Sequence, residues 1–293
     1  MRAFSPELTS HLFKDATTLC TCWIVRRRDG AVLGFTDHDA PLDVDGTRCE
    51  AATGFEPTTA VTELGLAPDN QQIAGALSAD AISSEDLQLG RYDGANVEVW
   101  LVNWARADSQ KHHLRTFILG EVVRSGAAFS AELRALASLL DQPIGRTFSR
   151  SCDATVGDSR CGVDLSDSRF RFEAQVISVT DRLTVEIIDP ISFDDGWFSN
   201  GKLRWVSGRN SGTSSEISRH VGKRISLWQA PAFPPSSDDQ CVLTAGCNKT
   251  FAQCRNRFEN GDNFRGFPHM PGGDLSLGYA DRDTLHDGSP LVV

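Results

Sequence analysis

The sequence predicts a mainly β fold with a few short helices. Three observations support this prediction: two-residue turns recur between strand-forming runs, apolar residues make up 40 % of the chain, and helical periodicity is confined to short stretches. This apolar content is enough to form a core, and 23 % charged residues is ordinary for a folded protein. The composition therefore excludes wholesale disorder.

Three dipeptide turns predict β-hairpins. Asp29-Gly30, Asp45-Gly46 and Asn200-Gly201 each lie between runs of strand-forming residues. Tight hairpin turns need positive φ at their central residues, which Gly, Asn and Asp tolerate best. Each of the three is therefore expected to join two paired strands.

Further strands are expected where β-branched and aromatic residues gather. Residues 97–104 form one such run, and residues 117–123 look like its neighbour in a sheet. In the second half, residues 172–179 and 183–188 flank a short Thr-Asp-Arg turn and are expected to pair.

Three short helices are expected, over residues 6–15, 130–140 and 250–258. Ser130 is a suitable N-cap for the second of them. Its apolar face would consist of leucines at spacings of three and four, namely Leu133, Leu136 and Leu140.

The chain is expected to form two domains, because its composition changes near Gly145. Residues 1–145 would be a β-rich N-terminal domain. Residues 146–293 hold two pairs of cysteines around a β insert at about residues 165–240. The segment from Gly266 onward is rich in Gly, Pro and Asp and is expected to run extended along a surface.

The net charge bears on whether the protein binds nucleic acid. A formal net charge of −10 argues against a surface built to hold phosphates, although an acidic lumen could let DNA slide past.

The N-terminus lacks an apolar run of signal-peptide length, and no stretch is long and apolar enough to span a membrane. Synthesis in the cytosol keeps thiols reduced. The eight cysteines therefore point to metal binding or buried free thiols more than to disulfides.

The cysteines of the first half suggest a core role. Cys20 and Cys22 are two positions apart, so on a strand they share one face. Together with Cys49 they are interpreted as small buried hydrophobic residues.

The cysteines of the second half suggest a metal centre. Cys152 and Cys161 stand nine positions apart, and Cys247 and Cys254 stand seven apart. A structural zinc site usually takes paired cysteines two to four residues apart, whereas an iron–sulfur cluster is larger and accepts wider, loop-spanning pairs. Disulfides or free thiols remain alternatives, and Cys241 could replace Cys247 as a ligand.

Helix geometry constrains the second pair. Seven residues within one helix would separate the two Cα atoms by roughly 10 Å. Cys247 is therefore expected in a turn before the helix, with Cys254 inside it.

Basic residues lie beside both pairs. An anionic cluster favours nearby cations, although a solvated basic face gives the same pattern. The flanking cations are Arg146, Arg150 and Arg160 for the first pair and Lys249, Arg255 and Arg257 for the second.

Candidate catalytic residues are few. Asp37, His38 and Asp39 are adjacent, but on a strand only the two aspartates would share a side, so a polar strand end is the preferred interpretation. The sequence has no HExxH, GxSxG or Walker-type motif. The protein is therefore expected not to be an enzyme.

The chain resembles the tail hub family of gene transfer agents and related siphophage-like prophages. The resemblance rests on CDATVGDSRCGVDL at residues 152–165 and TAGCNKTFAQCRNRFENGDNFRGFPHMPGGD at residues 244–274. Residues 34–58 and 90–104 are also similar to this family, so the resemblance covers nearly the whole chain. The cysteine region alone is similar to the tail-tip protein L family of phage lambda, which carries a [4Fe-4S] cluster on four cysteines with the same two spacings.

The resemblance implies hub-type β-barrel or β-sandwich domains and an iron–sulfur-bound C-terminal region. It implies a homotrimer at the tail tip of a virion or gene-transfer-agent particle, assembled in the bacterial cytoplasm. The trimer would line part of the DNA channel between the distal tail protein and a central, megatron-like tail fibre protein. The cluster ligands would be Cys152, Cys161, Cys247 and Cys254, although the long stretch between the pairs leaves their convergence open.

Two other functions stay open. One is a cytosolic iron–sulfur redox protein or enzyme, which would need a substrate or redox-partner site. The other is a tail-associated peptidoglycan hydrolase, which would need a convergent carboxylate or Cys/His site.

Overall fold

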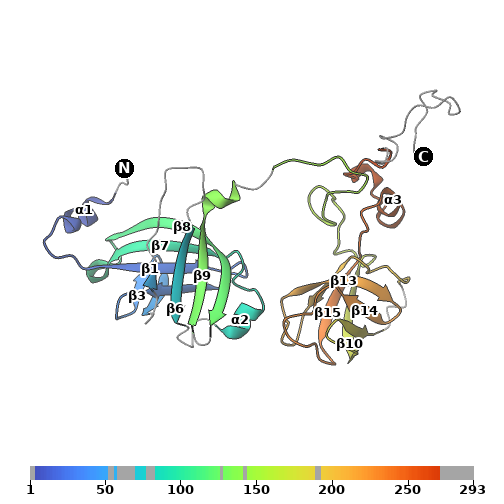
Figure 1. Ribbon diagram of the computed structural model, residues 1–293, viewed down its shortest axis with the longest axis horizontal. Helices are drawn as coiled ribbons and strands as arrows, with labels where there is room; N and C mark the ends of the chain where they lie inside the picture. The colour runs from blue at the N-terminus through green and yellow to red at the C-terminus, as the bar shows by residue number, and fades with distance from the viewer. Residues whose placement is uncertain are drawn as a thin grey trace, which may run out of the picture. The chain divides into compact units, whose positions relative to one another are not determined.

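The computed structural model describes residues 4–51, 56–57, 70–76, 83–125, 128–140, 144–188 and 193–270. The chain divides into two compact units, residues 1–144 and residues 145–293. Both are built mainly from β-strands with few short helices (Figure 1). Each unit is described here by itself.

The first unit is built on a nine-stranded sheet in the order β3-β4-β2-β1-β7-β8-β9-β6-β5. The pairs are antiparallel except for β2 and β4, which run parallel. The strands are β1 Leu19–Arg26, β2 Val32–Thr36, β3 Leu42–Val44, β4 Thr47–Ala51, β5 Glu56–Pro57, β6 Asn70–Ala76, β7 Asn96–Asn103, β8 Lys111–Ser125 and β9 Ala128–Ala135.

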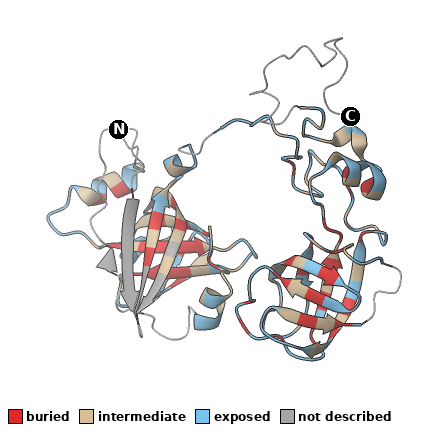
Figure 2. Cartoon of the chain, turned by 45° about the vertical axis from the view of Figure 1, so that its right-hand side comes forward, coloured by how far each residue is buried: buried red, intermediate tan, exposed pale blue. Residues whose placement is uncertain are grey.

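The first two predicted hairpins and the predicted strand pair of this unit are confirmed. Asp29-Gly30 joins β1 to β2 and Asp45-Gly46 joins β3 to β4, with φ of 51° at Asp45. Strand β7 pairs with residues 111–118 of β8. Most of β1 is buried (Figure 2), and its two faces pack in different cores: Trp23 belongs to one apolar cluster and Cys22 to another.

The helix predicted over residues 130–140 is wrong. Residues up to Ala135 form β9, which pairs with β6 and β8, and only a single 3₁₀ turn, Leu136–Leu139, follows. Ala131 and Leu133 are both buried, which is the two-residue period of a strand. Pairing on both sides satisfies the backbone groups, so tertiary context overrides the leucine spacing.

The other two predicted helices are present. Helix α1, Pro6–Leu12, is shorter than expected and is capped by the Ser5 side chain, which accepts from the Leu8 amide. Helix α3, Phe251–Phe258, begins after Thr250, whose hydroxyl accepts from the Gln253 amide. The structure adds a short helix α2, Ser84–Gln88.

The second unit contains a closed barrel in the order β10-β11-β14-β13-β12-β15, in which neighbouring strands run antiparallel. Inward side chains such as Val185, Leu203, Ile217 and Leu243 are fully buried in its core. The strands are β10 Arg171–Val179, β11 Thr184–Ile187, β12 Lys202–Trp205, β13 Ser214–Val221, β14 Arg224–Leu227 and β15 Gln240–Thr244.

Two predictions fall on this barrel, with opposite outcomes. The pairing of β10 with β11 around the Thr-Asp-Arg turn is confirmed. The prediction of a hairpin at Asn200-Gly201 is wrong. Residues 197–201 form turns, and β12 pairs with β13 and β15 instead. Asn200 does adopt the expected positive φ, 61°, so the dipeptide marks a turn but not a hairpin.

A cysteine region lies at one end of the barrel (Figure 1). It consists of the loop from residue 145 to the start of β10, helix α3 and the 3₁₀ turn Gly261–Asn263. This cysteine region has its own apolar core of Val163, Phe170, Ala245 and Phe258. No helix in the described part of the chain is long and apolar enough to cross a membrane.

Candidate cysteine site

Closure of the barrel brings the two cysteine pairs together. The first and last strands, β10 and β15, are neighbours, with Arg171 opposite Thr244. One step beyond this pair, the Ala245 amide donates to the Phe170 carbonyl at 2.7 Å. The chain therefore enters and leaves the barrel at the same place, and the loops before β10 and after β15 start side by side.

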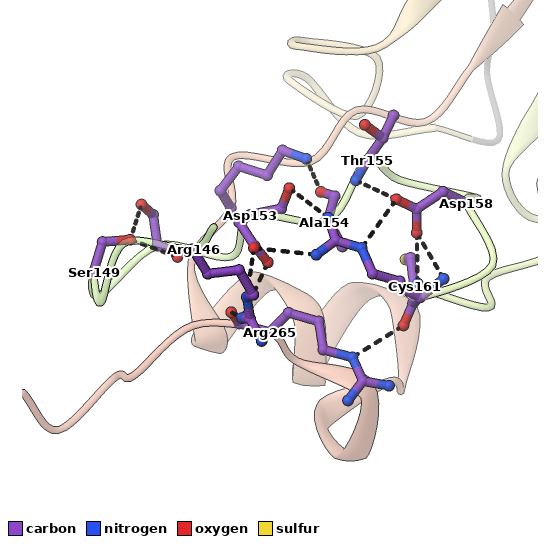
Figure 3. Close-up of polar contacts among 11 residues, drawn as sticks. Arg146, Ser149, Asp153, Ala154, Thr155, Asp158, Cys161 and Arg265 are labelled. Carbon is purple, nitrogen blue, oxygen red and sulfur yellow. Dashed lines mark hydrogen bonds and ion pairs between the residues drawn. The ribbon is translucent and has the colours of Figure 1, made fainter. Parts of the chain in front are cut away.

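The first cysteine loop is folded by Asp158. Its carboxylate accepts from the amides of Cys161 at 2.7 Å, Thr155 at 2.8 Å and Arg160 at 3.0 Å (Figure 3). These amides hold the pKa of the Asp158 carboxyl below its usual value, that of Cys161 having the largest effect. The carboxylate thereby fixes the direction in which Cys161 leaves the loop.

The second pair adopts the predicted arrangement, with Cys247 in the loop before α3 and Cys254 inside the helix. Lys249 takes a φ of 65°, which turns the chain into the helix, and its amide donates to the Cys247 sulfur at 3.4 Å. Gly246 is required by close packing, because a Cβ there would collide with the Ser199 carbonyl oxygen.

Direct contacts link the two loops. The Cys152 amide donates to the Lys249 carbonyl at 2.9 Å, and the Lys249 ammonium donates to the Ala154 carbonyl. On the other side, the Asn260 amide group donates to the Cys161 carbonyl at 2.6 Å. All four predicted ligands are free thiols.

The four thiols lie within electrostatic reach of one another. Burial, together with the charges of Cys247, Cys161 and Cys152, raises the pKa of the Cys254 thiol to about 11. Burial also raises the pKa of Cys247, against the opposing effect of Lys249. Ionisation of one thiol therefore opposes ionisation of the others unless a cation lies between them.

The four thiols are not grouped around a single-ion site among the residues that the structure describes. In the described part of the chain, no three His, Cys, Asp or Glu side chains are close enough to hold one metal ion, although the four thiols share one neighbourhood. A single zinc ion binds sulfur at about 2.3 Å. Four thiolates around it would therefore lie much closer together than four thiolates around a cubane cluster.

A buried indole N–H in the cysteine region has no hydrogen-bond partner within the described part of the chain. Trp197 packs against the same small core as Cys161 and Cys247, and its buried Nε1 has no hydrogen-bond acceptor among the described residues. A buried N–H without an acceptor is unfavourable, and the sulfur of a bound cluster could accept from it.

The basic residues that flank the cysteine pairs were expected to be counter-charges for the sulfurs. Some of them instead hold the local structure together. Arg146 and Arg160 both bond the Asp153 carboxylate, and Arg146 also donates to the Arg265 carbonyl (Figure 3). Arg150 donates to the Met270 carbonyl. Arg146 and Arg150 fasten residues 265–270 to the first cysteine loop, and the Arg160 side chain binds Asp153 within that loop, so none of the three is a free counter-charge.

Two of the remaining three cations are the charges near the sulfurs. Lys249 and Arg257 both interact electrostatically with Cys247, whereas Arg255 lies over the Phe251 ring. The Arg257 guanidinium stacks on Trp197 and donates to the Gly246 carbonyl at 3.1 Å.

The other four cysteines lie elsewhere. Cys20, Cys22 and Cys49 are buried in one core of the first unit, as predicted. Cys241 lies in the barrel core, where burial raises the pKa of its thiol to about 12. The suggestion that Cys241 replaces Cys247 as a ligand is therefore wrong, because it points into the barrel.

The polar stretch at residues 37–39 has local partners. Asp37 accepts from the Thr21 amide at 2.7 Å, and His38 bonds the Ala40 backbone. The His38 ring also lies 3.2 Å from the Asp39 carboxylate, but that side chain is 95 % exposed. This arrangement fits a polar strand end rather than a catalytic pair.

Sequence reasoning did not identify Asp158 or Asn260. For Asp158 a signal existed, because an aspartate followed by Ser-Arg-Cys favours a side-chain-capped turn. For Asn260 no local signal exists, since its partner Cys161 is 99 positions away.

Comparison with known proteins identifies relatives of both halves. A family model described as the N-terminal attachment domain of the baseplate hub protein matches residues 5–164. A second, described as phage conserved hypothetical protein BR0599, matches residues 196–274. A chain in a solved structure of the virion of a native gene transfer agent (GTA) particle is 38 % identical, with a TM-score of 0.88. That match covers 97 % of this chain and 98 % of the other. No curated protein matches the chain.

Proposed function

The chain belongs to the baseplate hub family of phages and gene transfer agents, and we propose that it is the structural hub at the tip of such a tail. The observation that carries the proposal is the match to a GTA virion chain over almost the full length of both chains. The hub would line part of the DNA channel and would join the distal tail protein to the central, megatron-like tail fibre protein. The net charge of −10 supports passage of DNA without adhesion.

We further propose that Cys152, Cys161, Cys247 and Cys254 hold a [4Fe-4S] cluster with a structural role. Support comes from the convergence of four free thiols at the base of a closed barrel, with Lys249 and the Trp197 N–H beside them. When bound, the cluster supplies a four-point cross-link between the two loops. Because a preformed site rarely exists in an unfolded chain, metal binding then contributes directly to folding.

A homotrimer is the proposed assembly. The family resemblance suggests it. Light scattering in the presence of the distal tail protein tests this directly. A stable monomer at every concentration would contradict a hub.

Anaerobic purification tests the cluster. We expect the broad visible absorption of an iron–sulfur centre and about four iron atoms per chain. Cys254→Ser should lose both and should be cut faster by protease between residues 251 and 270. The control Cys20→Ser should keep the iron and lose only about 1–3 kcal/mol of stability. Cleavage of Cys254→Ser at wild-type sites and rates would exclude a structural cluster.

The same preparation addresses the runner-up function. A cytosolic iron–sulfur redox protein would change its oligomeric state or ligand binding upon oxidation. A hub should instead assemble with its tail partners and show no turnover.

A further inference from the structure

Asn260 is the residue that connects the two cysteine pairs most directly. It follows α3 after Glu259, which ends the helix in the left-handed conformation with a φ of 50°. That turn directs the Asn260 side chain away from the helix axis and toward the first cysteine loop, 99 positions earlier in the chain.

Each polar group of Asn260 has a partner at the site. Its side-chain nitrogen donates to the Cys161 carbonyl at 2.6 Å and lies 3.7 Å from the Cys161 sulfur. Its backbone amide donates to the Cys254 carbonyl at 3.1 Å, and its carbonyl accepts from the Cys254 thiol at 3.2 Å. Its side-chain oxygen accepts from Asn263 at 2.7 Å, which fixes the orientation of the amide.

We propose that Asn260 is a positioning residue for the cluster, holding Cys161 and Cys254 together in the metal-free protein and donating an N–H bond to the Cys161 sulfur once metal is bound. The inference rests on the proposed cluster and names the residue that prepares its site. It follows from the contacts, because Asn260 touches one ligand of each pair through different atoms.

The chemistry requires an amide at this position. The side-chain NH2 group must reach a carbonyl and a sulfur while the oxygen of the same side chain accepts from Asn263, and only an amide supplies both functions in this shape.

The test compares Asn260→Asp with Asn256→Asp. The first keeps the shape and the acceptor for Asn263 but removes the donor to Cys161. The second makes the same chemical change on the exposed face of α3. Asn260→Ser, which adds no charge, is the second variant in case the aspartate prevents folding. Amide hydrogen exchange of peptides from β13 reports whether the barrel is intact in each variant.

In metal-free protein the readout is the rate at which iodoacetamide alkylates Cys161 and Cys254, measured by mass spectrometry. Loss of the side-chain hydrogen bond should raise the rate at Cys161 about tenfold in Asn260→Asp and Asn260→Ser, and leave Asn256→Asp near wild type. The rate at Cys254 should change less, because the Asn260 backbone groups that bond it remain. An unchanged rate at Cys161 would overturn the positioning role, whether or not wild type holds iron.

In the loaded protein the readouts are iron loss to a chelator and the reduction potential. Hydrogen bonds to cluster sulfurs raise the potential, so their removal should favour the oxidised form about tenfold, or about 59 mV for one electron. If the Asn260 variants have the same reduction potential as Asn256→Asp, the proposed N–H bond to the Cys161 sulfur is wrong. Wild type without iron would refute the cluster itself, and the alkylation rates would still decide the role of Asn260.

Discussion

Replacement of Phe258 by alanine should release the cysteine region while leaving the barrel folded. The Phe258 side chain is 7 % exposed, and its ring centroid lies 5.1 Å from that of Phe170. It packs in a core that contains Val163 and Ala245 and is separate from the barrel core. One turn earlier on the same helix face stands Cys254, so motion of Phe258 displaces a proposed ligand.

The expected loss of stability follows from the size of the side chain that is removed. A buried Phe→Ala change costs about 3–5 kcal/mol, of which the aromatic pair contributes about 1 kcal/mol. A free energy of this size is a large part of the stability of an ordinary domain, about 5–15 kcal/mol. Because every 1.4 kcal/mol is tenfold, protection of α3 amides should fall by about 100-fold or more.

Hydrogen exchange read by mass spectrometry on metal-free protein is the suitable assay. Peptides from residues 251–258 should lose protection, while those from β13 should keep it. The matched control is Phe251→Ala on the same helix, where a half-buried ring has one ring neighbour, Phe264, at 5.2 Å. Its effect should be about 1 kcal/mol. Equal effects of the two variants, or joint loss of protection in α3 and β13, would refute the reasoning from two separate cores.

Two further predictions concern glycine packing and pH. Gly34→Ala should lose about 1–3 kcal/mol by overpacking, because its Cβ would lie 2.5 Å from the Arg48 carbonyl oxygen and 2.9 Å from the Cys49 sulfur. Gly261→Ala, whose Cβ meets only ordinary contacts at 3.6 Å, is the control in urea unfolding, and equal midpoints would contradict the clash. Burial lowers the pKa of His220, so the unfolded chain takes up a proton that the folded chain does not, and stability should fall as pH drops below about 6.5. His220→Phe should weaken this dependence between pH 7.5 and 5, and parallel curves for variant and wild type would show that His220 is not responsible.

Local chemistry explains the elements that could be predicted from the sequence. The Asp-Gly turns, the β-rich runs around them and the Thr250 cap of α3 depend on residues a few positions apart, and each is present in the structure. The placement of Cys247 before the helix and Cys254 inside it also follows locally, from the rise of an α-helix.

The two wrong predictions of secondary structure, a helix over residues 130–140 and a hairpin at Asn200-Gly201, fall where strand partners distant in the sequence decide the structure. Residues 130–140 carry leucine spacing suited to a helix, yet β6 and β8 supply backbone partners on both sides of β9 and hold the residues up to Ala135 in a strand. At Asn200 the turn residue adopts positive φ as expected, but its neighbours pair elsewhere in the barrel. Strand partners are set by non-local packing, which a short window of sequence does not contain.

The amino-acid sequence by itself determined the mainly β class, the short helices at either end and the two cysteine pairs with their spacings. Only the tertiary structure decided that these pairs meet, because the meeting depends on β10 lying beside β15 when the barrel closes. It also decided that Cys241 points into the barrel core and that Asn260 reaches Cys161. The physical reason is that spacing along the chain is covalent and visible in the sequence, whereas contact between residues many positions apart is created by the register of strands that pair only on folding.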